Sequence, residues 1–251
     1  MKRVFKVFAL ITFAALMLTA CSGGKPAFVD TGKNGSRTND KVGFQFDPPK
    51  NGEEIAVLHT SLGDIKIRLF PKSAPIGVAN FKALIKKGYY NGKVFHRAEK
   101  NFCIQGGSEK GDGTGGNDAW GGTFPYEYNA NLRNFNGAVS YAHSTQPNSN
   151  TCQFFIITNT SVDEGVMNVL KTTMPADTSA LYTEKGGMPH LDGPVPGGGA
   201  DGYTVFGQVF EGMDIVTQIE NGLVKPSPDA TQQLLVDPIV ITTAELVKYK
   251  K

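Results

Sequence analysis

The segment from Glu54 to Pro71 constrains the fold most, because its apolar residues alternate with polar ones on both sides of a glycine. The sequence there reads EIAVLHTSLGDIKIRLFP. Alternation of this kind is typical of a half-buried β-strand, and Gly63 supplies the backbone freedom that a tight turn needs. The segment therefore predicts a β-hairpin of two antiparallel strands.

The rest of the chain continues this pattern of short strands. Further strands are predicted at about 93–97, 102–105, 137–142, 153–158, 203–209 and 235–243. Helices are predicted at 73–90, with Ser73 as N-cap and Pro75 in the first turn, and at 212–220. Many strands in hairpin order with two helices predict a mainly β fold, a closed antiparallel barrel capped at its ends.

Residues 162–189 interrupt the strand pattern and are predicted to be an insertion. A helix is expected over 162–172, followed by a return segment that contains proline and glycine. Because the segment lies between two predicted strands, it should leave the barrel without disturbing the strand order.

The N-terminus has the features of a bacterial lipoprotein signal peptide over residues 1–20. Lys2, Arg3 and Lys6 precede an apolar stretch at 7–18 that is too short for a comfortable membrane span. The following LTAC resembles a lipobox. This resemblance implies that Cys21 carries lipid, with palmitate as one of its acyl chains, and becomes the first mature residue. The alternative is an ordinary secretory signal with an incidental cysteine. The lipobox interpretation places the protein at the cell membrane, lipid-anchored on its extracytoplasmic side.

Composition and charge limit the functions and the domain boundaries that the chain can have. Of 25 basic and 23 acidic residues, three basic ones lie in the first twenty positions, so the rest of the chain is close to neutral. A near-neutral chain offers no electrostatic basis for binding nucleic acid. Residues 21–52 are polar and rich in glycine and predict a flexible tether, which places the folded domain at 53–251.

The cysteines and histidines do not indicate a metal site. The four histidines show no ligand spacing with Cys103 and Cys152, so neither a metal nor another cofactor is expected. Both cysteines lie in apolar strand-like runs, where cysteine is often simply buried. They are therefore expected to be free thiols.

Candidate functional residues occur in three segments: FHRAEKNFCIQGG from Phe95, VSYAHSTQPNSNTCQFFIIT from Val139, and HLDGPVPGGGADGYTVFGQVFEGMDIV from His190. They contain, in order, the motifs Phe95-His96-Arg97, Phe102, Gln105-Gly106-Gly107, Gly113-Thr114-Gly115-Gly116, Gln153-Phe154-Phe155 and Val205-Phe206-Gly207. Together these motifs resemble the cyclophilin family of peptidyl-prolyl isomerases, from about Ile55 to Val247 with the insertion set aside. The resemblance implies an eight-stranded barrel with two capping helices.

The same resemblance implies roles for individual residues. Arg97, Phe102 and Gln105 match the catalytic group, in which the arginine donates a hydrogen bond to the proline nitrogen and the glutamine holds it. The positions that match substrate-binding residues are Cys103, His143, Gln153, Phe155, His190, Leu191 and Tyr203. Several depart from the common pattern: Cys103 replaces methionine, His143 asparagine, His190 tryptophan and Tyr203 histidine.

The expected function is peptidyl-prolyl isomerisation that assists the folding of exported proteins at the membrane surface. The expected partners are proline-containing peptides, unfolded exported proteins and, through Cys21, the membrane; a monomer is expected. Two alternatives stay open. The domain could be a proline-peptide-binding or chaperone module with little turnover, and Arg97 could be a structural ion-pair partner of Glu99 or Glu109.

Overall fold

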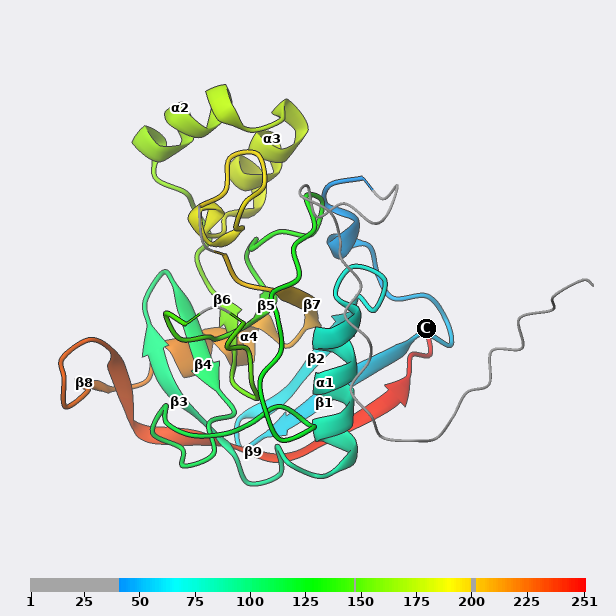
Figure 1. Ribbon diagram of the computed structural model, residues 1–251, viewed down its shortest axis with the longest axis vertical. Coiled ribbons are helices and arrows are strands. Elements are labelled where there is room, and N and C mark those ends of the chain that lie inside the picture. Colours follow the sequence, from blue (N-terminus) through cyan, green and yellow to red (C-terminus); the bar gives the residue numbers. More distant parts are fainter. Residues whose placement is uncertain (1–40, 147, 200–201) are drawn as a thin grey trace, which may run out of the picture.

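The computed structural model describes residues 41–146, 148–199 and 202–251 (Figure 1). The predicted signal peptide and Cys21 lie outside these residues. Within the described ranges, no helix has both the length and the apolar character that crossing a membrane requires.

The strands form one antiparallel sheet that closes on itself. They are β1 (Glu54–Thr60), β2 (Gly63–Leu69), β3 (Val94–Glu99), β4 (Cys103–Gly106), β5 (Ala138–Tyr141), β6 (Phe154–Ile157), β7 (Val205–Glu211), β8 (Val224–Pro226) and β9 (Gln233–Lys248). In the described part of the chain, eight of them make a ring in the order β1-β2-β7-β5-β6-β4-β3-β9, and β9 pairs back onto β1. The prediction of a closed eight-stranded barrel is confirmed; β8, which pairs with the start of β9, was not predicted.

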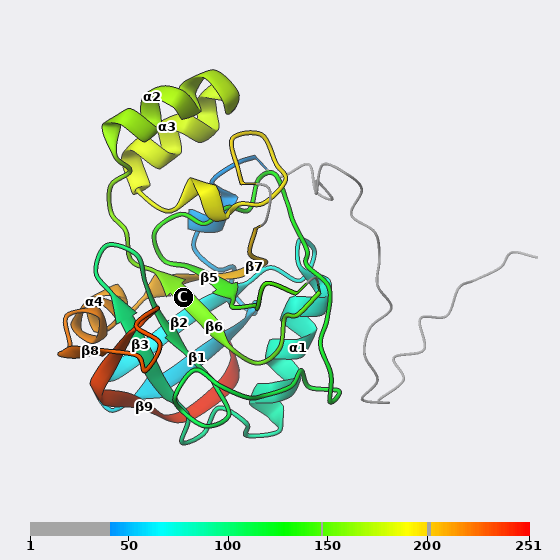
Figure 2. The same cartoon turned by 60° about the vertical axis from the view of Figure 1, so that its left-hand side comes forward.

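Two helices cover the barrel from opposite sides, as predicted (Figure 2). Helix α1 (Pro75–Lys86) buries Phe81, whose ring lies 5.5 Å from that of Phe154 and 4.9 Å from that of Phe206. Helix α4 (Met213–Glu220) buries Val216 and Ile219. The core of the barrel is thus filled mainly by aromatic and aliphatic side chains.

Helix α1 begins differently from the prediction. Its N-cap is Ala74 rather than Ser73, and no side chain of the cap residue accepts a hydrogen bond. The backbone N–H groups of Ile76 and Gly77 instead donate to the carboxylate of Glu127, at 3.1 and 2.8 Å. A negative group suits a helix N-terminus because the free N–H groups there are partly positive. A distant side chain therefore replaces the local cap, while Pro75 does occupy the first turn.

The insertion contains two helices, α2 (Glu164–Thr173) and α3 (Ala176–Lys185), which stand apart from the barrel (Figure 1). The first confirms the predicted helix; the return segment contains the proline and glycine expected, and also a second helix that was not predicted. Pro175 is the N-cap of α3, where its missing N–H costs nothing, and Gly186 at φ 71° ends the helix. Proline and glycine therefore mark the ends of a helix here.

Residues 41–52 pack against the barrel. A short 3₁₀ helix, η1 (Phe44–Phe46), buries Gln45, whose amide donates to the backbone oxygen of Arg133 and to Oε1 of Gln208. Farther along, Arg68 donates to the backbone oxygen of Asp47 at 2.9 Å. The prediction of a flexible tether is therefore wrong for residues 41–52, because these contacts fix the segment. The rest of the predicted tether lies outside the described residues.

Candidate active site

Strand β3 divides its side chains between the core and the outer face of the barrel. His96 is buried at 1% exposure, and burial lowers the pKa of His96 to about 4, with a smaller contribution from the charge of Arg97. His96 is therefore neutral at ordinary pH. Its neighbour Arg97 is partly exposed and pairs in register with Gln105 on β4, after a register shift that separates it from Phe95.

The guanidinium of Arg97 is held from two sides. Its Nη1 donates to Oε1 of Gln105 at 2.8 Å, and its Nε and Nη2 donate to Oε1 of Glu99 at 3.1 and 2.7 Å. The guanidinium carbon lies 5.5 Å from the centre of the Phe102 ring. Arginine has about five N–H donors. These contacts use three, and the rest can meet a substrate.

A chain of amide hydrogen bonds supports this arginine. Gln105 donates from Nε2 to Oε1 of Gln153 at 3.1 Å, and Gln153 donates from its own Nε2 to the backbone oxygen of Gly113 at 2.9 Å. Because each amide nitrogen must donate onward, the oxygen of Gln105 has to face Arg97. The glycine-rich loop thereby fixes the orientation of both glutamines.

A cavity of about 200 Å³ opens beside the free face of Arg97. It is lined by Arg97, Phe102, Cys103, Gln105, Ala142, His143, Phe155, Leu191, Tyr203 and Gln232. Pockets for whole drug-sized ligands usually measure roughly 300–1,000 Å³. This cavity, called the proline pocket below, suits a single small side chain.

The floor of the proline pocket is apolar and its rim is aromatic. Phe155, Leu191 and Cys103 are buried. Burial raises the pKa of Cys103 to about 12, so the thiol stays neutral. At the rim, the ring of Tyr203 stacks on His143 at 4.2 Å and meets Phe155 edge-on at 5.3 Å. The pocket can therefore hold an apolar ring with one strong cationic donor at its edge.

The structure brings most of the predicted site residues together. Eight of them line the proline pocket, and Gln153 lines an adjoining cavity of about 480 Å³ together with Gly113 and Gly115. His190 differs: it is exposed in the 3₁₀ helix η2 (Pro189–Leu191) and does not line the pocket, although the next residue does. The expected pocket role of His190 is therefore not supported.

Sequence reasoning missed Gln232 and Ala142 and gave Glu99 only a structural role. Strand alternation could have identified Glu99, since it lies two positions after Arg97 on the same face. The ion pair between them is real, and Arg97 lines the pocket as well. Gln232 comes from the turn between β8 and β9, for which no local pattern gives a signal.

The described part of the chain contains two cysteines and several groups of polar side chains that bear on other possible chemistry. Cys103 and Cys152 are both buried and free. In the described part of the chain, no group of three or more His, Cys, Asp or Glu side chains is arranged to hold a metal ion. The arrangement of Arg97, Gln105 and the apolar pocket is therefore the strongest candidate site.

Comparison with known proteins agrees with this geometry. A family model described as cyclophilin type peptidyl-prolyl cis-trans isomerase/CLD matches residues 55–246. A Staphylococcus aureus (strain USA300) protein named as a peptidyl-prolyl cis-trans isomerase is 37% identical over 191 residues, which cover 76% of this chain and 92% of that protein. A Streptococcus pyogenes protein named as a bifunctional phosphatase/peptidyl-prolyl cis-trans isomerase is 39% identical, over 74% of this chain and 39% of its own length.

Solved structures show the same likeness. The crystal structure of a Cryptosporidium parvum cyclophilin type peptidyl-prolyl cis-trans isomerase, in the presence of the dipeptide Ala-Pro, matches with a TM-score of 0.58 and 27% identity. The match covers 78% of this chain and 99% of that one. A second structure of the same protein gives a TM-score of 0.60 at 26% identity.

Proposed function

Since this chain belongs to the cyclophilin family of peptidyl-prolyl cis-trans isomerases, we propose that it isomerises X–Pro bonds in exported proteins as they fold at the membrane surface. The observation that carries the catalytic part is Arg97, held by Gln105 at the edge of an apolar pocket and left with free donors. The proposed substrates are proline-containing peptides and unfolded exported chains, and the proposed acting form is a monomer.

The chemistry follows from the X–Pro amide. Its nitrogen lone pair is delocalised into the carbonyl, so the uncatalysed rotation takes roughly tens to hundreds of seconds. At the twisted transition state this delocalisation is lost, and the proline nitrogen can accept a hydrogen bond. Arg97 can donate one there but has little to donate to in the planar ground state. The arginine therefore stabilises the transition state selectively.

Positioning supplies the rest of the stabilisation. An acceleration of about 10⁵ corresponds to roughly 7 kcal/mol, more than one charge-assisted hydrogen bond provides. The proline ring would be held by Phe102, Phe155 and Leu191, which lie on three different segments around the pocket. Because Gln105 and Glu99 already fix the guanidinium, little reorganisation is needed when the amide twists.

The membrane location rests on the N-terminal sequence. Basic residues, a short apolar stretch and LTAC precede the tether, and these support lipidation of Cys21. Mass spectrometry of the mature protein tests this directly. We expect a lipid-modified N-terminal Cys21 in the membrane fraction and no lipidation of the Cys21→Ser variant. A mature N-terminus at another residue, without lipid, would contradict the proposal.

One observation favours a second candidate, a proline-binding module with little turnover. Glu99 pairs with Arg97 and offsets the charge that the transition state needs. An exchange assay by NMR on a short X–Pro peptide, with a soluble chain of residues 22–251, separates the two candidates. Catalysed exchange at substoichiometric protein supports the enzyme, whereas binding without faster exchange supports the module.

A further inference from the structure

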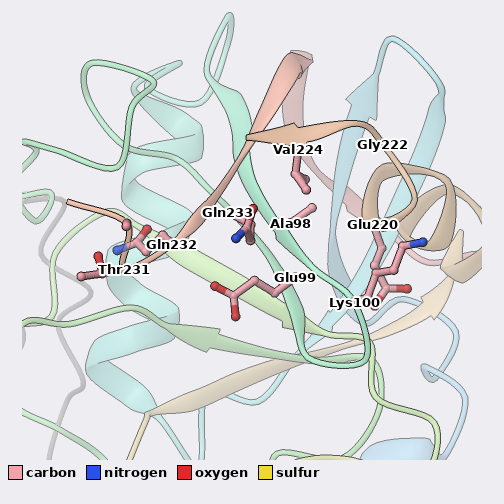
Figure 3. A pocket seen from close by; sticks show the side chains of 10 residues that line it. Ala98, Glu99, Lys100, Glu220, Gly222, Val224, Thr231, Gln232 and Gln233 are labelled. Carbon is pink, nitrogen blue, oxygen red and sulfur yellow. The ribbon is translucent and has the colours of Figure 1, made fainter. Parts of the chain in front are cut away.

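A third cavity lies on the other side of Glu99 from the proline pocket. It measures about 400 Å³ and is enclosed by the β3–β4 turn, the end of α4 and the hairpin formed by β8 and β9 (Figure 3). Glu99, Glu220 and Gln232 are among its lining side chains. We call it the hairpin cavity. Nothing in the mechanism described above uses it.

The β8–β9 hairpin is attached directly to the strand that carries the catalytic arginine. Val224 pairs with Leu235 within the hairpin, and the neighbouring Leu234 pairs with Arg97 on β3. Register pairing between β3 and β9 stops there, so Ala98 and Glu99 face the cavity instead of a β9 partner. The hairpin therefore stands beside the active site as a fixed wall.

The turn of this hairpin is also well defined. The backbone N–H of Ser227 donates to the oxygen of Gln232 at 2.8 Å, and the N–H of Gln232 donates to Oγ of Ser227 at 3.1 Å. Asp229 accepts from the N–H of Thr231 at 3.1 Å and from its hydroxyl at 2.8 Å. These bonds hold Gln232 in place at the tip.

Two side chains connect the hairpin cavity with the proline pocket. Gln232 lines both, and Glu99 lines the hairpin cavity while its Oε1 binds Arg97. An extended peptide advances about 3.3–3.6 Å per residue. From a proline beside Arg97, a peptide that runs past Glu99 and Gln232 would therefore bring a residue two or three positions away to the hairpin cavity.

The charge of the hairpin cavity indicates which side chain it would take. Glu220 is fixed through its Oε1, which accepts from the N–H of Asn101 at 2.8 Å and the hydroxyl of Thr158 at 2.6 Å. Among the described residues, the hydrogen bonds of Glu99 and Glu220 use only Oε1, so each keeps a second oxygen for a ligand. Lys100 is the single cation among the described lining residues.

We propose that the hairpin cavity is a second substrate subsite, which binds a lysine or arginine side chain two or three residues from the isomerised proline. Glu220 and Glu99 supply the carboxylate oxygens, and the amide of Gln232 contacts the peptide between the two cavities. The proposal rests on the proposed isomerase function and adds a sequence preference to it. Exported proteins with a basic residue near a proline would then be preferred clients.

The test uses the mature soluble chain and capped octapeptides that share a central Ala-Pro. They carry Lys, Ala or Glu two or three residues from the proline, on either side. We expect kcat/KM to be roughly two- to fivefold higher for Lys than for Ala on at least one side, the size of one partly exposed ion pair. The preference for Lys peptides should decrease in 1 M salt, because the Debye screening length is then only about 3 Å. Equal values for Lys and Glu peptides on both sides would overturn the proposal.

Variants of the lining residues test whether the preference for Lys peptides arises in the hairpin cavity. Gln232→Lys should invert the preference, so that Glu peptides exceed Lys peptides, and Glu220→Gln should weaken it while keeping an acceptor for Asn101 and Thr158. Glu184→Gln, which removes an exposed carboxylate on α3, is the matched control and should leave the preference unchanged. Thermal unfolding checks that each variant is folded. An unchanged preference in folded Gln232→Lys and Glu220→Gln would overturn the assignment to this cavity.

The assay also separates failure of the subsite from failure of the isomerase function. The Ala peptide reports isomerisation alone, so its turnover without a Lys preference refutes only the subsite. If no peptide is turned over, binding of the Lys and Glu peptides is followed through NMR shifts of the Gln232 side-chain amide. Stronger shifts with Lys support the subsite in that case, and equal or absent shifts refute it.

Discussion

Arg97 Nη1 lies 2.8 Å from Oε1 of Gln105, and the two residues are direct register partners on neighbouring antiparallel strands. The sheet itself therefore sets the position of the cation, because a change in this pairing would need a shift of β3 against β4. Donors that are fixed before the reaction need no reorganisation at the transition state. The rigidity of the barrel would in this way contribute to the catalysis proposed for Arg97.

Arg97→Ala should lower kcat/KM for a short X–Pro peptide by roughly tenfold or more, a loss of about 1.4 kcal/mol of transition-state stabilisation. The side chain is partly exposed, so the fold should remain intact. Arg97→Lys is the matched comparison: it keeps the charge but loses the planar set of donors, and should recover only part of the rate. NMR exchange measures all three proteins; wild-type activity in Arg97→Ala would refute the assigned role.

Gln105→Ala should also lower kcat/KM, but less than Arg97→Ala does, because Glu99 would still hold the guanidinium. Gln105 is expected to act by holding Arg97 in position. The kcat/KM of the Arg97→Ala/Gln105→Ala double variant should therefore be no lower than that of Arg97→Ala alone. Residues that share one hydrogen-bond network couple in this way. A double-mutant cycle on kcat/KM measures the coupling, and additive losses would show that Gln105 acts on the substrate independently of Arg97.

Burial of His96 should make stability depend on pH. Its folded pKa of about 4 lies below the ordinary value of about 6.5, so between these values the unfolded chain binds a proton that the folded chain does not. The free energy of unfolding should therefore fall as the pH drops from about 6.5 to about 4, by roughly 3 kcal/mol from this residue.

Urea unfolding of the wild type and of His96→Gln across that pH range tests the effect of His96. The variant lacks the titrating ring, so its stability should change less over the same interval. Two nearby charges also act on the pKa of His96: Arg97 lowers it and Asp112 raises it. Both effects are smaller than the effect of burial. Parallel pH profiles for the two proteins would mean that His96 does not titrate as its burial implies.

Much of the barrel could be predicted from alternation, because each long strand has one face in the core. Strand β8 was not predicted because its three residues, Val224–Pro226, are all exposed and show no alternation of apolar and polar side chains. Helix α3 was not predicted because it lies in a segment noted only for its proline and glycine. These residues are compatible with a helix when they stand at its ends, as Pro175 and Gly186 do. The fixed segment 41–52 was missed because its few apolar residues lie within a polar stretch. The ring of Phe44 packs against Phe70 and that of Phe46 against Phe135, and Gln45 between them is buried.

Most of the residues that line the proline pocket could be predicted because they lie in compact motifs whose order and spacing are specific. Gln232 could not, since it reaches the pocket only through the pairing of β9 with β3, more than a hundred residues away in sequence. His190 shows the opposite error. Its position in the motif suggested the pocket, but in the short helix η2 the side chain turned toward the pocket is that of Leu191.

The insertion is joined to the pocket wall by a buried polar network around Asp192. Its Oδ2 accepts from Nη1 of Arg133 at 3.1 Å and from the hydroxyl of Tyr182 on α3 at 2.6 Å, while Oδ1 accepts from the N–H of Asn134 at 2.8 Å. The side chains of Asp192 and Arg133 are each 1% exposed, and Asp192 directly follows Leu191 of the proline pocket.

Removing one member of this network should be costly, because it leaves a buried charge uncompensated. Arg133→Ala should lower the free energy of unfolding by about 3–5 kcal/mol, and Tyr182→Phe, which removes one hydrogen bond, by about 1–3 kcal/mol.

The loss in Arg133→Ala should also depend on pH, because burial raises the pKa of Asp192. As the pH falls, the Asp192 carboxyl of the folded variant should take up a proton before that of the unfolded chain does, and part of the lost stability should return. Urea unfolding at pH 5 and pH 8 measures this, with exposed Lys171→Ala on α2 as the control. A loss for Arg133→Ala no larger than that of the control would show that the network does not hold the insertion to the pocket wall.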